Sequence, residues 1–177
     1  MQASVFIATS LDGYIARLDG ARDSLPGDDV ENHGYHEFMA SVDVLTSGRT
    51  TFDLVVSFGS WPYGDKPVVV LSSRAGELKA PDGAKCEFMS GAPSEIVARL
   101  SKRGFLHAYV DGGVTVTKFL EAGLLQRMIV RRIPVLIGSG IPLFGNLPSD
   151  IRFQHVRTQS YKGGLVQSEY MVMENEN

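Results

Sequence analysis

Two segments of this chain place glycine where an apolar strand ends and a helix begins, and they constrain the fold more than any other feature. The segments are Thr46-Ser47-Gly48-Arg49-Thr50-Thr51-Phe52 and Tyr109-Val110-Asp111-Gly112-Gly113-Val114-Thr115. At each junction the first backbone N–H groups of the helix lack partners within the helix, so an anion can bind there. Two such junctions in one small domain indicate a ligand with several phosphates, held across the carboxyl ends of neighbouring strands.

Length and charge narrow the class of protein. The 177 residues predict a single domain, residues 1–177, that is long enough to bury a substantial core. A net charge of −3 without a Lys/Arg-rich run argues against a nucleic-acid partner. Cys86 is the lone cysteine, which fits a reducing compartment. Because no signal-peptide pattern is present and no apolar stretch approaches about 18 residues, we expect a soluble cytoplasmic protein without membrane contact.

Strand-like and helix-like segments alternate along most of the chain, and strands close it. Helices are expected over residues 31–41, 50–58, 93–103 and 114–122, and a long surface loop over 17–29. Strands are expected over residues 3–9, 42–47, 66–71, 86–89, 107–110 and 126–137, followed by a hairpin of residues 151–160 and 165–173 around Lys162-Gly163-Gly164. This order predicts an α/β fold: a mostly parallel central sheet with helices on both faces and an antiparallel C-terminal hairpin.

The first glycine junction carries side chains suited to phosphate. In Gly48-Arg49-Thr50-Thr51 the glycine permits close backbone approach, the arginine suits bidentate phosphate contact, and two hydroxyl groups stand at the helix start. An N-capped helix with a solvated arginine is the ordinary structural explanation. It accounts for Thr50 but not for the whole cluster, so we favour phosphate binding.

The other glycine-bearing and hydroxyl-bearing turns leave two explanations open. Asp111-Gly112-Gly113 suits pyrophosphate because glycine permits positive φ, yet a tight strand-to-helix turn would look the same. The segment Leu71-Ser72-Ser73-Arg74 suits the 2′-phosphate of an adenosine ribose, and equally a polar turn. Gly138-Ser139-Gly140 is followed by Pro142 and no helical pattern, so it is interpreted as a loop that lines a pocket.

Signatures of other chemistry are weak. The four histidines and Cys86 show no metal-ligand spacing, so no metal site is predicted. Asp12 lies in a turn after the first strand, where an Asx-turn role competes with catalysis. Glu31 opens an expected helix, where a carboxylate also favours the helix dipole.

Five motifs in a fixed order give the chain a resemblance that spacing alone does not supply. They are Ser10-Leu11-Asp12-Gly13-Tyr14-Ile15-Ala16, Gly48-Arg49-Thr50-Thr51-Phe52, Val69-Val70-Leu71-Ser72-Ser73-Arg74, Val110-Asp111-Gly112-Gly113, and Pro134-Val135-Leu136-Ile137-Gly138-Ser139-Gly140-Ile141-Pro142-Leu143-Phe144. Over nearly its full length the chain resembles the dihydrofolate reductase-like superfamily. Within it, the chain is most similar to the reductase domain of the bifunctional deaminase-reductase of riboflavin synthesis and its stand-alone relatives.

The resemblance implies an NADPH-dependent reductase with its cofactor on the glycine junctions. Ala8 and Ile15 would flank the nicotinamide, and Arg74 would favour the 2′-phosphate. The remaining cofactor residues would be Gly48, Arg49, Thr50 and Thr51 at phosphates, Leu71, Ser72 and Ser73 beside the adenosine, and Asp111, Gly112, Gly113 and Thr115 at the pyrophosphate junction.

On the substrate side, the resemblance implies hydride transfer to a small heterocycle or a ribosylamino-pyrimidine, as in a 5-amino-6-(5-phosphoribosylamino)uracil reductase. We expect the acceptor to lie between Tyr35, Phe38 and the loop of Gly138, Ser139 and Gly140, with a proton from Asp12, Glu31 or water. A nucleotide-binding module of the same fold without turnover, and a dihydrofolate reductase, are the alternatives. Family analogy also predicts a homodimer.

Overall fold

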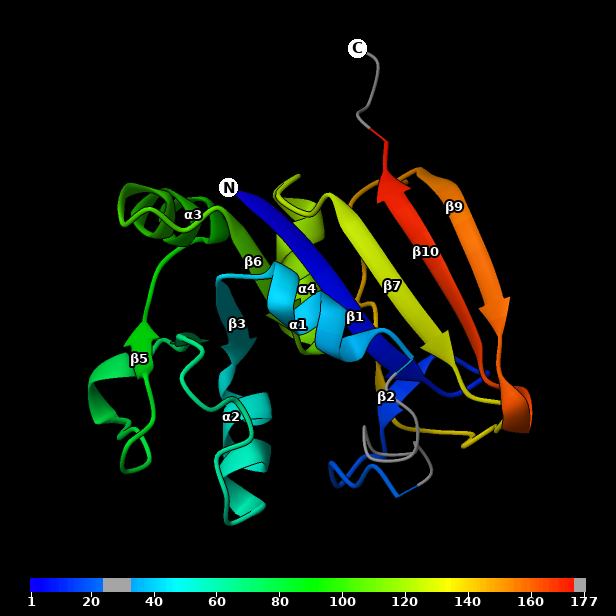
Figure 1. The fold of residues 1–177 in the computed structure, drawn as a ribbon, viewed down its shortest axis with the longest axis horizontal. Helices are drawn as coiled ribbons and strands as arrows, with labels where there is room; N and C mark the ends of the chain where they lie inside the picture. Colours follow the sequence, from blue (N-terminus) through cyan, green and yellow to red (C-terminus); the bar gives the residue numbers. More distant parts are fainter. Residues whose placement is uncertain (24–32, 174–177) are drawn as a thin grey trace.

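A computed structural model describes residues 1–23 and 33–173. Ten strands and four α-helices make up this part of the chain (Figure 1). The helices are α1 (Tyr35–Ser41), α2 (Arg49–Ser57), α3 (Pro93–Lys102) and α4 (Gly113–Glu121). The strands are β1 (Gln2–Thr9), β2 (Tyr14–Ala16), β3 (Val44–Gly48), β4 (Val68–Leu71), β5 (Cys86–Met89), β6 (His107–Asp111), β7 (Arg127–Arg132), β8 (Ile141–Pro142), β9 (Phe153–Ser160) and β10 (Val166–Val172).

Eight of the strands form one sheet in the order β5-β4-β3-β6-β1-β7-β10-β9. Pairing is parallel from β5 through β7, and β10 runs antiparallel to both β7 and β9. The predicted α/β fold, with a mostly parallel sheet and an antiparallel C-terminal hairpin, is therefore confirmed. Parallel pairing brings the carboxyl ends of β4, β3 and β6 to one edge of the sheet, which is the edge from which both glycine junctions lead into helices.

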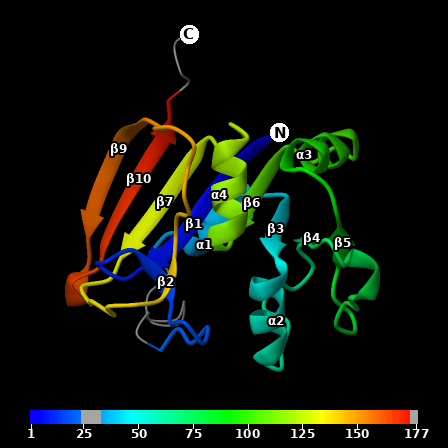
Figure 2. The ribbon, with the colours of Figure 1, turned by 180° about the vertical axis from the view of Figure 1, so that it is seen from behind.

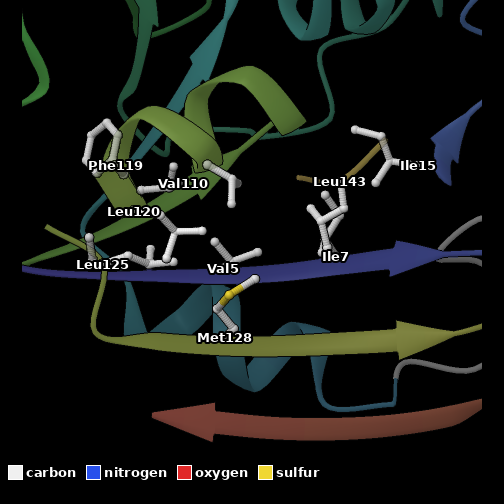
Figure 3. Close-up of a cluster of buried hydrophobic side chains, with 11 residues drawn as sticks. Val5, Ile7, Ile15, Val110, Phe119, Leu120, Leu125, Met128 and Leu143 are labelled. Carbon is white, nitrogen blue, oxygen red and sulfur yellow. The ribbon is translucent and has the colours of Figure 1, made fainter. Parts of the chain in front are cut away.

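Helices cover both faces of the sheet. Phe38 of α1 and Phe52 of α2 pack with Phe6, Leu45 and Ile129 in one buried cluster, which defines the α1 face. On the opposite face, α4 contributes to a second buried cluster with β1 and β7, shown in Figure 3 and made of Ala3, Val5, Ile7, Ile15, Val110, Val116, Phe119, Leu120, Leu125, Met128 and Leu143. The two views of Figures 1 and 2 show α1 in front of the sheet from one side and α4 in front from the other.

Two elements have different bounds in the structure from those that the sequence predicts. The strand expected over 126–137 stops at Arg132, because Pro134 has no N–H to donate and regular pairing with β1 ends at Thr9. The helix expected from residue 31 begins at Tyr35 within the described residues, because His33 and Gly34 have φ values of +41° and +87° that a right-handed helix does not allow.

A second, two-stranded sheet was not predicted from the sequence. β2 pairs antiparallel with β8, which fixes the segment after β7 against the turn after β1. Gly140 makes this contact close, since a Cβ there would collide with the Ala16 carbonyl oxygen. No helix in the described ranges is long and apolar enough to cross a membrane.

Candidate functional site

The two glycine junctions lie side by side and contact one another. Ser47 at the end of β3 pairs with Asp111 at the end of β6, so α2 and α4 begin at neighbouring strand ends. A Cβ on Gly112 would lie 2.7 Å from Thr51 Oγ1, and one on Gly48 would lie 3.0 Å from Thr115 Oγ1. Each junction thus approaches a threonine in the first turn of the opposite helix, and only glycine leaves the room for that approach.

Both helices present their first N–H groups without side-chain caps. Gly48 precedes α2 and Gly112 precedes α4, and neither helix N-terminus receives a side-chain hydrogen bond from its cap residue. Gly112 has φ +90°, in the region that favours glycine. Gly113 is equally constrained, because a Cβ there would lie 2.5 Å from the Pro142 carbonyl oxygen. Two adjacent helix N-termini with open donors suit an anionic ligand.

A cavity of about 660 Å³ opens in front of these helix ends. Its volume falls within the usual range of small-molecule sites. Twelve of the fourteen residues expected to hold the cofactor line it: Ile15, Gly48, Arg49, Thr50, Thr51, Leu71, Ser72, Ser73, Asp111, Gly112, Gly113 and Thr115. Residues from four parts of the sequence therefore meet around one space.

The charge of the lining is opposite to that of the chain. Among the described residues that line the cavity, Arg22, Arg49 and Lys118 are the cations and Asp111 is the carboxylate, whereas the whole chain carries −3. The Asp111 side chain, which is 7% exposed, accepts a hydrogen bond of 2.8 Å from the Gly112 N–H. Arg49 Nε lies 3.2 Å from Asp53 on the exposed side of α2, a pair that contributes little to stability. The cavity thus concentrates positive charge beside two helix N-termini.

Sequence reasoning missed one end of the cavity. Met89, Ser90, Gly91 and Pro93 line it where β5 leads into α3. A signal was available, because this is a third strand-to-helix junction with glycine before proline at the helix start. Arg22 and Lys118 were also missed, since neither lies in a glycine motif.

Two expected cofactor residues lie elsewhere. Ala8 is buried within β1, 7% exposed, and does not line the cavity. Arg74 is also absent from the lining; its exposed side chain lies 3.8 Å from Glu77. The turn at Ser72 explains this, because the Arg74 N–H donates to Ser72 Oγ and the chain bends away from the sheet edge there. Arg49, rather than Arg74, therefore brings a guanidinium to the cavity.

Asp12 ties two loops together. Its carboxylate accepts hydrogen bonds from Ser10 Oγ at 2.6 Å, from the Gly138 N–H at 2.8 Å and from the Ile137 N–H at 3.3 Å. The Ser10 hydroxyl is the main cause of a lowered pKa for Asp12, with smaller contributions from the two N–H groups. The side chain is thus ionised near neutral pH, which makes it a poor proton donor. Glu31, the other candidate acid, lies outside the described residues.

The residues expected to hold the substrate do not share one site in the described structure. Phe38 is 4% exposed, and its ring packs 5.2 Å from Phe6 and 5.0 Å from Tyr109, so it is a core residue. Phe38 follows Tyr35 by three residues, and this spacing places both rings on the side of α1 that packs against the sheet. Tyr35 is partly exposed and contacts Phe6 at 5.5 Å. Gly138, Ser139 and Gly140 lie at the β1–β2 turn, where Asp12 holds the loop.

The strand order and the paired glycine junctions define a dihydrofolate reductase-like α/β domain. The model of the RibD C-terminal domain family matches residues 3–167, and the chain belongs to that family.

Similar proteins agree with this assignment. A candidate riboflavin biosynthesis protein from Shewanella sp. PV-4 is 40% identical, with a TM-score of 0.90 and coverage of 98% of this chain and 100% of that one. The uncharacterised protein YwjB of Bacillus subtilis is 32% identical over 94% of this chain and 95% of its own length. Dihydrofolate reductase from Enterococcus faecalis, in complex with NADP(H), has the same fold at 14% identity, with a TM-score of 0.69 and coverage of 98% and 97%.

Proposed function

We propose that this protein is an NADPH-dependent reductase that transfers a hydride to a ribosylamino-pyrimidine or a related small heterocycle. The observation that carries the proposal is the pair of uncapped helix N-termini of α2 and α4 on one cavity lined by Arg22, Arg49 and Lys118. A dinucleotide with three phosphate groups is the common cellular ligand whose charge fits such a lining. Membership of the RibD C-terminal domain family and the fold shared with an NADP(H)-binding reductase support this choice.

Each part of the cavity has a role in this proposal. The N–H group of Gly113 at the open start of α4 binds the pyrophosphate, since the Gly112 N–H already donates to Asp111, while Ser72, Ser73 and Arg49 bind the adenosine end and its 2′-phosphate. Ile15 then stands at the nicotinamide end, where β2 closes over the cavity. The cofactor supplies the hydride, so the chain's task is to orient the two reactants and exclude water.

The proton in this reaction comes from solvent water in our proposal. Asp12 is held as a carboxylate by Ser10 and the Gly138 N–H, so we assign it a positioning role for the loop after β7. In the described residues no group of three or more His, Cys, Asp or Glu side chains is placed to hold a metal ion.

A titration of NADPH against NADH tests the cofactor assignment. We expect NADPH to raise the melting temperature more than NADH does, and Arg49→Ala to reduce that preference more than Arg74→Ala. Arg99→Ala on α3, outside the cavity lining, is the matched control for loss of a surface cation. A wild-type protein that shows no preferential shift with NADPH would overturn the proposal.

An acceptor screen separates the enzyme from its alternatives. Oxidation of NADPH is followed with 5-amino-6-(5-phosphoribosylamino)uracil and with dihydrofolate. Turnover with the first supports the proposed substrate class, and turnover with the second makes the protein a dihydrofolate reductase. A protein that quenches NADPH fluorescence but oxidises NADPH with neither acceptor is a nucleotide-binding module without turnover. The homodimer and the cytoplasmic location stay predictions, to be checked by light scattering and by cell fractionation.

A further inference from the structure

A second cavity, of about 260 Å³, opens on the face of the sheet that carries α4. Side chains of β7 and β10, which alternation along each strand directs to that face, form its floor, and the segment that joins β8 to β9 supplies a wall. The apolar lining residues are Met128, Val130, Leu143, Phe144, Phe153 and Val166. In Figure 2 the described helices leave β9 and β10 uncovered on this face. Because Phe144 and Val166 are exposed, the cavity opens to solvent.

This second cavity is separate from the one proposed to bind the cofactor. No described residue lines both cavities. Ile141 lines the first, whereas Leu143 and Phe144 line the second, so the short segment 141–144 divides the two. The Leu143 N–H donates to the Gly13 carbonyl oxygen at 3.1 Å, which fixes this segment against the turn after β1. A ligand in the second cavity is therefore expected to bind whether or not NADPH occupies the first.

One end of the second cavity carries a cation without a partner. Arg132, the last residue of β7, is exposed, and it is the charged residue among the described residues that line this cavity. Its guanidinium makes no ion pair or hydrogen bond within the part of the chain that the structure describes. The adjoining turn holds the carboxylate of Asp12, which already accepts hydrogen bonds from Ser10 Oγ and the Gly138 N–H. An anion in the cavity would therefore meet an uncompensated positive charge.

A buried hydroxyl group lies beside the guanidinium. Thr9 of β1 pairs directly with Arg132 of β7, so their side chains are neighbours on this face. Thr9 is 2% exposed and lines the cavity, and its hydroxyl makes no hydrogen bond within the described ranges. A buried hydroxyl without a partner costs free energy, which an acceptor on a ligand would recover. Arg132 and Thr9 thus offer two adjacent donors and a single positive charge, which suit a carboxylate.

The rest of the cavity suits an aromatic body. Phe153 and Tyr170 line it, and their ring centres lie 6.3 Å apart at an interplanar angle of 75°. Val166 pairs with Arg132, and Tyr170 lies four residues further along β10, so the groove extends about 13 Å from the guanidinium. Phe144 and Val166 are exposed on its rim. A ring in the groove would remove their apolar surface from water and pack against the two lining rings.

We propose that this cavity binds an aryl alkanoate, which is an aromatic ring joined by a short chain to a carboxylate. The carboxylate accepts hydrogen bonds from the Arg132 guanidinium and the Thr9 hydroxyl, and the ring packs against Phe153 and Tyr170. A volume of about 260 Å³ is smaller than that of most small-molecule sites, so it limits the ligand to one ring and a short chain. The site is independent of the proposed reductase function.

The test uses 4-phenylbutyrate as the probe, 4-phenylbutyramide as its neutral partner and butyrate as the anion without a ring. Binding is measured by calorimetry, with and without saturating NADP⁺, for wild type, Arg132→Met, Thr9→Val and Val166→Phe. Arg99→Met on α3 removes an exposed cation outside both cavities and is the matched control. Val166→Phe fills the groove from its rim and keeps both hydrogen-bond donors. Melting temperatures confirm that each variant is folded.

The proposal predicts a different result for each variant. Wild type should bind 4-phenylbutyrate equally with and without NADP⁺, and butyrate about tenfold more weakly or worse, because the ring is not buried. Arg132→Met should weaken binding of 4-phenylbutyrate about tenfold or more and abolish the preference for the carboxylate over the amide. Thr9→Val should weaken binding of 4-phenylbutyrate about threefold or more. Val166→Phe should weaken binding of both phenyl compounds, and Arg99→Met should bind as the wild type does.

Three results would overturn the inference. The first is a wild-type protein that does not bind 4-phenylbutyrate at millimolar concentration. The second is an Arg132→Met variant that still prefers the carboxylate to the amide, or that loses no more affinity than Arg99→Met. The third is competition by NADP⁺, which would place the probe in the first cavity. If Arg132→Met does not fold, Val166→Phe decides, because unchanged binding in that variant excludes the groove as the site.

Discussion

Replacement of Gly112 by alanine tests whether the contact between the two junctions serves ligand binding. Gly112 has φ +90°, and an added Cβ would lie 2.7 Å from Thr51 Oγ1. Gly104, at the end of α3, has φ +89° and nothing within 4 Å of the position of its Cβ. Gly104→Ala therefore shares the positive φ without the collision, and it is the control for that part of the backbone strain.

The expected effects on stability and on binding differ in size. Alanine in the positive-φ region costs about 1–3 kcal/mol, of which about 0.4–1 kcal/mol is offset by a less flexible unfolded chain. Gly104→Ala should therefore lose about 1–2 kcal/mol of unfolding free energy, and Gly112→Ala should lose more, because its φ of 90° with ψ of 132° and the contact with Thr51 add strain. In Gly112→Ala the Thr51 side chain must also rotate about χ1, which a β-branched residue resists and which turns its hydroxyl away from the cavity. Loss of one hydrogen bond to a phosphate weakens NADPH binding by roughly tenfold or more.

Urea unfolding and NADPH fluorescence titration measure the two quantities on the same samples. We expect a lowered urea midpoint in both variants, with the larger loss in Gly112→Ala, and a rise in the dissociation constant for NADPH in Gly112→Ala alone. If Gly112→Ala binds NADPH as tightly as Gly104→Ala, the contact between the two helix N-termini serves packing only. The assignment of this junction to the pyrophosphate is then wrong.

Three further predictions concern stability and reactivity. Burial alone would raise the pKa of Glu169, but hydrogen bonds from Arg127 and Arg157 lower it below 4.5. Above pH 4.5, Glu169→Gln should therefore reduce the unfolding free energy by about 1–3 kcal/mol. That difference should fade as the pH falls through the lowered pKa, and a constant difference in urea unfolding down to pH 3 would contradict it. Burial, with a smaller contribution from Glu87, raises the pKa of the Cys86 thiol to about 11, so iodoacetamide should label it slowly at pH 7 until urea unfolds the chain. Phe38→Ala should lower the unfolding free energy by about 3–5 kcal/mol, as loss of a core ring does, and a variant as stable as the wild type in urea would contradict that core role.

The meeting of the two glycine junctions on one cavity was predictable because its signals are local. Glycine directly after an apolar strand marks a junction, and parallel pairing then brings such junctions to one edge of the sheet. Placing Gly48 and Gly112 together requires only that β3 and β6 be neighbours in the sheet, and not the rest of the strand order. The same logic would have found the third junction at Gly91, which Pro93 marks from the helix side.

Arg74 shows where local reasoning fails on the same edge. Its motif follows a buried strand in the expected way, but the turn that Ser72 Oγ makes with the Arg74 N–H directs the chain outward. Arg49 reaches the cavity because it stands on the first turn of α2, whose direction is set by β3. Helix direction, rather than residue type, decides which arginine lines the cavity.

The substrate side depends on register, which the sequence does not contain. Arg131 and Arg132 are adjacent and chemically identical, and alternation along β7 sends them to opposite faces of the sheet. Which one faces α1 is decided only when Ala8 pairs with Arg131 and Phe6 with Ile129, because a shift of one residue would exchange the two arginines. That register in turn depends on Pro134 ending β7 and on Asp12 holding the following loop through the Gly138 N–H. Loss of the Asp12 contact should therefore disturb turnover of the acceptor before it disturbs NADPH binding, since the glycine junctions lie on strands that Asp12 does not touch. Asp12→Ala, compared with wild type by NADPH titration and by the acceptor screen, separates these effects, and an equal loss of both would show that the two halves of the site are not independent.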